Sequence, residues 1–239
     1  SDSTSPPLLE MKEIVKTFPG VKALKGVSLM LNNGEVLALV GENGAGKSTL
    51  IKALGGVHLP DSGEIIIDGR PVMLSSPHVS QLEGIAIIFQ EFNLAPKLSA
   101  RENLFLGKEI VSRGFIDHRA ERSRARELFQ QLGMSIDPEA RCEDLTVAEQ
   151  QTVEIARALA SEARIIVMDE PTAALSQQEV EKLLSIIRRL RDEGISIIYI
   201  SHRLEEIYEV ADRVTVLRDG ETVGEAPVVD VSKSQLIEW

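Results

Sequence analysis

The stretch Gly41-Glu-Asn-Gly-Ala-Gly-Lys47-Ser48-Thr49 decides how this chain folds, because it fits the phosphate-binding pattern G-x-x-x-x-G-K-[ST]. Glycines at positions 41, 44 and 46 permit backbone angles closed to other residues and let main-chain N–H groups approach phosphate oxygens. The Lys47 ammonium supplies positive charge for the terminal phosphates, and the Ser48 hydroxyl is an oxygen ligand for Mg²⁺. The residues predicted to bind the triphosphate are Gly41, Glu42, Asn43, Gly44, Ala45, Gly46, Lys47, Ser48 and Thr49.

The residues on either side of this loop support that interpretation. Val36-Leu-Ala-Leu-Val40 is a short apolar run that predicts a buried strand, and Ser48 to Leu54 predicts a helix. A strand, a glycine-rich loop and a helix in this order place the phosphates at the positive N-terminus of the helix. The alternative is a chance match in an ordinary turn, and the flanking elements argue against it.

Length and charge limit the other possibilities. At 239 residues, with 43% hydrophobic and 26% charged residues, the chain can form one large α/β domain or two small ones. The net charge of −11 argues against a broad nucleic-acid surface, which needs clustered positive charge. The single cysteine, Cys142, excludes an internal disulfide and is expected to be inert. The polar segment 1–7 predicts a flexible tail ahead of a domain over 8–239.

The order of the remaining elements predicts an α/β fold with a mainly parallel sheet covered on both faces. Between two strands, apolar residues from Val180 to Leu190 mark one face of a helix, and Ser176 with Glu179 predicts a capping box at its start. A charged, helical segment at about 97–160 interrupts the alternation and predicts an inserted helical subdomain. The predicted strands are 8–15, 27–31, 64–68, 85–89, 165–168, 195–200 and 214–217.

A second nucleotide motif is predicted at Ile165-Ile-Val-Met-Asp169-Glu170. Here an apolar strand ends in two carboxylates, at the sheet edge where open α/β folds bind ligands. Asp169 can hold magnesium directly or through water, and Glu170 can orient or deprotonate the water that attacks the γ-phosphate. An ordinary strand end followed by a polar turn is the alternative.

Together these motifs and three others resemble the nucleotide-binding domain of ABC transporters, from about Leu8 to Trp239. Gln90 ends a strand as the Q-loop glutamine does, His202 follows a strand as the switch histidine does, and Phe18 occupies the place of the aromatic that stacks on adenine. The resemblance implies an ABC-type ATPase core with a mainly parallel sheet, an antiparallel β subdomain and a helical insertion. It implies catalytic roles for Glu170, His202 and Gln90, and Mg²⁺ held by Ser48, Gln90 and Asp169.

Each of the three single residues also has a simpler interpretation. Phe18 can be a core aromatic, and Gln90 can be one more exposed glutamine. His202 can be a surface histidine at a helix start that Ser201 caps.

The family signature, usually Leu-Ser-Gly-Gly-Gln, corresponds here to Leu145-Thr-Val-Ala-Glu-Gln150. Its two glycines are replaced, which restricts close backbone approach to a phosphate. A capping box still predicts a helix start whose N–H groups can point at a phosphate held by a partner domain. Ser176 replaces the usual aspartate of the D-loop, so contacts across a domain pair are expected to differ. The signature residues are Leu145, Thr146, Val147, Ala148, Glu149 and Gln150.

These departures are similar to those of ATPases from bacterial monosaccharide importers of the ribose, galactose, arabinose and xylose kind. The similarity implies ATP and Mg²⁺ as cofactors, sugar import driven by ATP hydrolysis, and a peripheral place on the cytoplasmic face of the inner membrane. The implied partners are a second nucleotide-binding domain (in tandem or as a homodimer), transmembrane permease subunits and, indirectly, a periplasmic sugar-binding protein, with no nucleic acid. We expect the chain to be the N-terminal half of a longer polypeptide. The shared runs are Phe18–Leu24, Phe89–Leu94, Glu102–Gly107 and Tyr199–Arg203.

Two other classes of protein share the phosphate loop. A soluble ABC-type ATPase that acts on ribosomes or DNA is disfavoured by the acidic charge, the signature and the absence of a long coiled-coil pattern. A P-loop kinase of small molecules leaves the signature and His202 unexplained.

Overall fold

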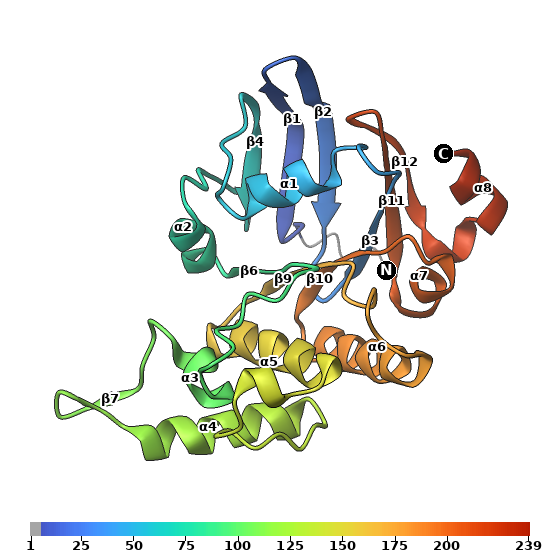
Figure 1. The fold of residues 1–239 in the computed structure, drawn as a ribbon. Coiled ribbons are helices and arrows are strands. Elements are labelled where there is room, and N and C mark those ends of the chain that lie inside the picture. The colour runs from blue at the N-terminus through green and yellow to red at the C-terminus, as the bar shows by residue number, and fades with distance from the viewer. Residues whose placement is uncertain (1–5) are drawn as a thin grey trace.

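A computed structural model describes residues 6–239, so most of the predicted tail at 1–7 lies outside the described residues. The centre of the fold is a six-stranded sheet in the order β12-β11-β3-β10-β9-β6 (Figure 1). The five strands from β11 to β6 run parallel to one another, and the edge strand β12 is antiparallel to β11. The strands are β3 (Val36–Val40), β6 (Ile85–Ile88), β9 (Ile165–Asp169), β10 (Ser196–Ile200), β11 (Arg213–Arg218) and β12 (Glu221–Pro227).

Both faces of this sheet are covered, as the apolar runs predict. Alternate residues of a strand point to opposite faces, and in β10 Ile198 and Ile200 enter one apolar core while Ile197 and Tyr199 enter another. All four side chains are at most 1% exposed. The sheet is therefore the rigid layer between two cores, and its strand ends carry the candidate site.

One core lies between the central sheet and a separate four-stranded antiparallel sheet of order β2-β1-β4-β5. Helix α1 (Lys47–Leu54) packs there through its buried residues Leu50, Ile51 and Leu54. The antiparallel strands are β1 (Leu9–Phe18), β2 (Val21–Leu31), β4 (Ser62–Ile67) and β5 (Arg70–Val72), with the short helix α2 (Pro77–Leu82) after them.

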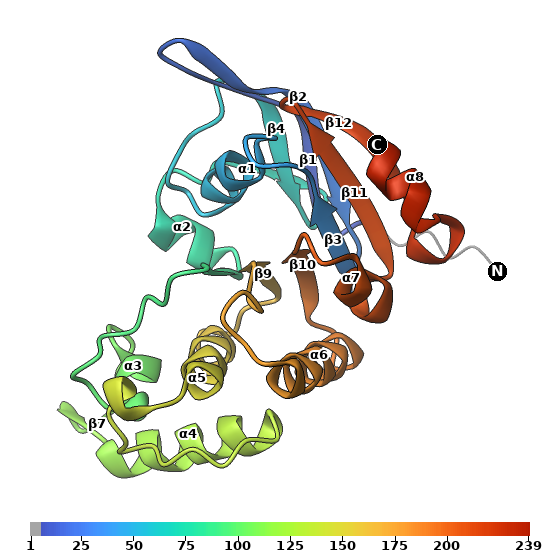
Figure 2. The same ribbon diagram turned by 45° about the vertical axis from the view of Figure 1, so that its right-hand side comes forward.

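The other core joins the sheet to the helices of the central segment and to α6 (Figure 2). Phe129 of α4 and Val153 of α5 are each at most 1% exposed, and they belong to the same core as Ile187 of α6. The helices are α3 (Ala100–Phe105), α4 (His118–Gln131), α5 (Val147–Ala160) and α6 (Gln177–Asp192), and the small hairpin β7 (Val111–Ser112) and β8 (Phe115–Ile116) extends from them. Among the described residues, no helix combines the length and the apolar character needed to cross a membrane.

The C-terminal part of the chain completes the edge of the central sheet. Helices α7 (Leu204–Val210) and α8 (Lys233–Glu238) pack with β11 and β12 around a third, smaller apolar core. Helix α8 lies beside β12 in both ribbon views (Figures 1 and 2).

Two predicted strand boundaries are wrong. The predicted first strand, 8–15, continues to Phe18, and its partner, predicted over 27–31, begins at Val21. The two strands form a hairpin in which Thr17 pairs with Lys22 and Phe18 with Val21. Because this end of the hairpin is largely exposed, its polar composition hid it from a search for apolar runs.

The predicted helix caps are confirmed. Thr146 and Glu149 form a reciprocal capping box at the start of α5. At the start of α6, the Glu179 carboxylate accepts hydrogen bonds from the main-chain N–H of Ser176 (2.8 Å) and from its hydroxyl (2.7 Å).

Candidate functional site

The phosphate loop joins the end of β3 to the start of α1, as predicted, and a neighbouring turn packs tightly against it. A side chain at Gly41 would place a Cβ atom 2.3 Å from the main-chain oxygen of Leu217, so only glycine fits. The N–H of Gly220, in the turn between β11 and β12, donates to the Ala45 oxygen at 3.1 Å. Gly46 caps α1 with φ of 105°, a conformation that favours glycine. The shape of the loop is therefore restricted by the end of β11 and its following turn, and by the backbone angle of Gly46.

The Lys47 ammonium is held at the loop itself. It donates to the main-chain oxygens of Gly41 at 2.5 Å and Glu42 at 3.1 Å. Burial lowers the pKa of Lys47, and the carboxylates of Glu170 and Asp169 oppose that shift. Lys47, Asp169 and Glu170 line the same cavity, so the two predicted motifs meet in space.

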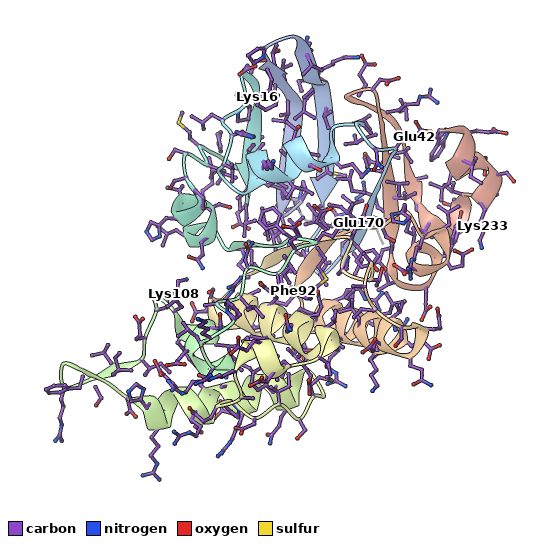
Figure 3. The ribbon with its side chains drawn as sticks, viewed as in Figure 1. Lys16, Glu42, Phe92, Lys108, Glu170 and Lys233 are labelled. Atoms are coloured by element: carbon purple, nitrogen blue, oxygen red, sulfur yellow. The ribbon has the colours of Figure 1, made fainter. Side chains whose placement is uncertain are left out.

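The two carboxylates follow β9, next to β10 in the sheet. Burial raises the pKa of Asp169, the charge of Glu170 raises it further, and Lys47 opposes both effects. Glu170 has φ of 47°, an unusual value for a residue with a side chain, and its N–H donates to the Ile200 oxygen at 3.0 Å. Figure 3 shows Glu170 near the middle of the molecule, between the strands and the helices below them.

His202 contacts Glu170 directly. Its Nδ1 atom lies 3.3 Å from Oε1 of Glu170, and its side chain is 68% exposed while that of Glu170 is 22% exposed. Helix α7 begins at Leu204 with Arg203 as its N-cap residue, so His202 and Ser201 precede the helix start. A histidine at this place can hold one ring nitrogen on Glu170 while the other faces solvent or a ligand.

A cavity of about 690 Å³ joins most of the predicted residues. Phe18 is partly exposed and lines it, with its ring edge-on to His58 at 5.2 Å between centroids. This exposure disfavours a core role for Phe18. Neither Gly41 nor Ala45 nor His202 belongs to the lining. The predicted residues that line the cavity are Phe18, Glu42, Asn43, Gly44, Gly46, Lys47, Ser48, Thr49, Gln90, Asp169 and Glu170.

The oxygen atoms in this cavity suit a magnesium ion bound together with phosphates. Ser48, Gln90 and Asp169 all line it and offer a hydroxyl, an amide oxygen and a carboxylate, which are the hard ligands that Mg²⁺ takes. Within residues 6–239, no group of three His, Cys, Asp or Glu side chains could hold a metal alone. Mg²⁺ in proteins usually keeps water and phosphate oxygens as its remaining ligands.

Three charged residues that the sequence did not single out also line the cavity: Lys22, Lys25 and Asp219. Lys25 is tied to the turn of Asp219, since its main-chain N–H donates to the Gly220 oxygen at 2.8 Å. The pair Asp219-Gly220 is a recognisable turn signal, but nothing local in the sequence shows that this turn packs on the phosphate loop.

The signature segment lies elsewhere, at the start of α5. None of its residues, Leu145 to Gln150, lines the cavity. Thr146 caps the helix, the Gln150 amide donates to the Leu145 oxygen at 2.9 Å, and Val147 is 37% exposed. Because the cap takes the Glu149 N–H, the N–H groups of Val147 and Ala148 are the ones left for a ligand outside the cavity.

The loop that follows β6 and begins near Gln90 is fastened to the helices. Glu154 of α5 accepts the main-chain N–H of Asn93 at 2.8 Å, and Arg157 of α5 donates to the Asn93 oxygen at 2.8 Å. The Asn103 side chain of α3 accepts the main-chain N–H of Ala95 at 2.7 Å and donates to the Ala95 oxygen at 3.0 Å. Gln90 thus links the cavity to a loop that is hydrogen-bonded to α3 and α5.

A glycine loop with its lysine, facing two carboxylates at the edge of a parallel sheet, defines a P-loop nucleotide-binding protein. Residues 24–173 match the family model described as "ABC transporter". The chain belongs to the ABC transporter family, as an ATP-binding cassette.

Curated relatives match nearly all of this chain. It is 53% identical over 231 residues to ribose import ATP-binding protein RbsA 1 of Rubrobacter xylanophilus, covering 97% of this chain and 46% of the relative. It is 49% identical to ribose import ATP-binding protein RbsA 2 of Escherichia coli O157:H7, covering 98% and 46%. The chain therefore spans about half the length of the curated relatives it matches.

Solved structures confirm the fold. A nucleotide-free ATP-binding cassette from an ABC transporter matches with a TM-score of 0.83 and 26% identity, over 98% of this chain and 94% of that one. A dimeric post-hydrolysis state of the cassette MJ0796, bound to ADP and phosphate, matches with a TM-score of 0.78 and 29% identity, over 92% and 98%.

Proposed function

We propose that this chain binds and hydrolyses ATP and thereby drives import of a monosaccharide through separate transmembrane subunits. The observation that carries the proposal is the meeting of Lys47, Asp169 and Glu170 around one cavity lined by the phosphate loop. The names of the relatives, which are ribose import ATP-binding proteins, support the sugar. They weigh against an ATPase that acts on ribosomes or DNA.

The roles of the residues follow from their chemistry. The loop N–H groups and Lys47 hold the β- and γ-phosphates, and Phe18 stacks on the adenine ring. Glu170 orients the attacking water and accepts its proton, while His202 contacts the γ-phosphate from the next loop. Mg²⁺, held by Ser48, Gln90 and Asp169, would neutralise phosphate charge when bound.

The second half of the site comes from a partner domain. The signature segment Leu145–Gln150 lies outside the cavity, so its helix start would serve ATP held by another nucleotide-binding domain, in tandem or as a homodimer. A relative of known structure is dimeric with ADP and phosphate bound, which supports this arrangement. Closure of two domains would exclude water and complete the site.

This role places the chain peripherally on the cytoplasmic face of the bacterial inner membrane, against permease subunits that receive sugar from a periplasmic binding protein. We propose one nucleotide-binding domain over 8–239, with a helical subdomain at about 97–160. The loop that follows Gln90, fastened to the helices through Asn93, is the proposed route by which ATP binding reaches the permease.

Replacement of Lys47 by alanine tests the site. Lys47→Ala removes the ammonium and is expected to weaken ATP binding at least tenfold, measured by titration calorimetry. Lys52→Ala, in the same helix but outside the cavity, serves as the matched control. Equal ATP affinity of both variants would contradict the assignment of the cavity.

A transport assay tests the physiological role. The protein is purified as expressed from its gene and examined for co-purifying permease and sugar-binding subunits. Ribose uptake into vesicles that needs ATP would support the importer, whereas co-sedimentation with ribosomes would favour the other class.

A further inference from the structure

A buried carboxylate lies next to the candidate site and has no role in the function proposed above. Glu206 of α7 is only 4% exposed, and one of its oxygens, Oε2, accepts three hydroxyl hydrogen bonds. The donors are Tyr199 at 2.7 Å, Thr172 at 2.9 Å and Ser201 at 3.0 Å, each at most 5% exposed. Its other oxygen lies 3.3 Å from the Arg203 guanidinium.

The hydroxyls come from the two chain segments that carry Glu170 and His202. Thr172 belongs to the turn directly after Glu170, which the Ala173 N–H closes by donating to the Glu170 oxygen at 3.2 Å. Ser201 precedes His202, and its oxygen also accepts the N–H of Arg203 at 3.0 Å. Glu206 therefore binds both segments at once, and it is not among the residues that line the cavity.

The charge of Glu206 makes these bonds strong and directional. Hydrogen bonds from hydroxyls to a carboxylate are roughly twice as strong as neutral ones. Burial and the bond to Glu206 raise the pKa of Tyr199, so the phenol keeps its proton and remains a donor. Each hydroxyl has one proton to give, and here all three are given to the same oxygen.

Stability alone is a poor explanation for this arrangement. A buried charge loses its hydration, and replacing buried charged groups by apolar side chains of similar volume is often neutral or stabilising. What an apolar side chain would not provide is a fixed distance between the Thr172 turn and the Ser201 turn. Glu170 and His202 lie next to these two turns, so their separation depends on that distance.

We propose that Glu206 is a positioning residue, which holds the Ser201–Arg203 turn against the Thr172 turn and so keeps His202 in contact with Glu170. The contact that it maintains is the 3.3 Å separation between Nδ1 of His202 and Oε1 of Glu170. This inference rests on the proposed ATPase function for its kinetic consequence, but its geometric claim can be tested without turnover.

The kinetic test uses Glu206→Gln in the protein as expressed from its gene. The amide has one oxygen and one NH₂ group in place of two acceptor oxygens. Either the NH₂ group faces the three hydroxyls, which lose their acceptor, or it faces the Arg203 guanidinium, which loses its own acceptor. We expect kcat for ATP hydrolysis to fall about tenfold with KM for ATP changed less than about twofold, because the loss is in the transition state. Glu205→Gln, the same change at the adjacent exposed residue, is the matched control and should hydrolyse at the wild-type rate.

A double-mutant comparison separates positioning from general destabilisation. In a His202→Ala background, Glu206→Gln should lower kcat no further, because residues that act through one another are not additive. If kcat of the double variant falls by the product of the two single-variant effects, the proposal is overturned. If Glu206→Gln does not fold, Thr172→Val removes one of the three bonds at constant size, and the same non-additivity is expected of it.

The geometric test observes His202 directly. The protein has four histidines, so ¹⁵N-histidine labelling gives few ring signals, and His202→Ala assigns the relevant one. We expect Glu206→Gln to move the ¹⁵N chemical shifts of the His202 ring towards the values that the same ring has in the Glu170→Gln variant. The signals of His78 and His118 should stay unchanged. Unchanged His202 shifts would overturn the proposal, whether or not the wild-type protein hydrolyses ATP. A wild-type protein without ATPase activity but with the expected shifts would contradict only the proposed function.

Discussion

Replacement of Glu154 by alanine tests the junction between the loop after β6 and the helix α5. The main-chain N–H of Asn93 donates to this buried carboxylate at 2.8 Å, and a bond from N–H to a charged acceptor contributes about 2 kcal/mol. The ion pair with Arg157 adds about 1 kcal/mol, since the arginine is 28% exposed and can regain water. Glu154→Ala should therefore lower the free energy of unfolding by about 3 kcal/mol.

The isosteric variant Glu154→Gln should cost less, at most about 1 kcal/mol. Its amide oxygen can still accept the Asn93 N–H. The neutral amide also avoids the cost of burying a charge, which is the effect that raises the pKa of Glu154. Urea unfolding followed by circular dichroism measures both variants. Glu181→Ala, on the exposed face of α6, is the control and should change the free energy by less than about 0.5 kcal/mol. An alanine variant no less stable than the glutamine variant would refute the reasoning.

Three other changes test the site and its surroundings. Glu170→Gln should keep ATP affinity but lower kcat about 10²- to 10⁴-fold in a steady-state ATPase assay, and a wild-type rate would remove Glu170 from its catalytic role. Gly41→Ala forces a Cβ to within 2.3 Å of the Leu217 oxygen and should weaken ATP binding at least tenfold by calorimetry. Gly69→Ala, where a Cβ meets nothing within 4 Å, should leave the affinity for ATP unchanged. An equal loss of ATP affinity in both variants would point to general strain instead of a specific clash. Burial raises the pKa of Cys142 to about 11, so the native thiol should resist iodoacetamide at pH 8 and react in urea. The pKa of Cys142 in the folded protein exceeds the value of about 8.5 for an unfolded chain, so its contribution to stability is complete below about pH 8.5 and is lost as the pH rises towards 11. Rapid alkylation of the native protein would contradict the burial of this thiol.

The parts of the fold that sequence predicts well are those with local causes. The glycines of the phosphate loop, the apolar strand that ends at Asp169 and the capping box of Thr146 each depend on residues a few positions apart. Local spacing was sufficient there, and the structure has the loop, the strand and the cap at the predicted positions.

The parts that sequence missed depend on partners far along the chain. In the pair Glu205-Glu206, one glutamate is exposed and the other is 4% exposed, and only the hydroxyls around Glu206 distinguish them. Asp219 reads as part of an ordinary turn, because its place in the cavity depends on β2 and the phosphate loop. Helical or strand periodicity contains no information about either arrangement.

The position of β3 in the sheet has a consequence for synthesis on the ribosome. This strand and its phosphate loop are made early, but β3 is hydrogen-bonded to β10 and β11, which are made much later. The Val36 N–H, for example, donates to the Asp212 carboxylate 176 residues away. A nascent chain that has not yet reached β10 has its glycine loop but neither neighbouring strand, so the nucleotide site can assemble only after β10 and β11 have been made.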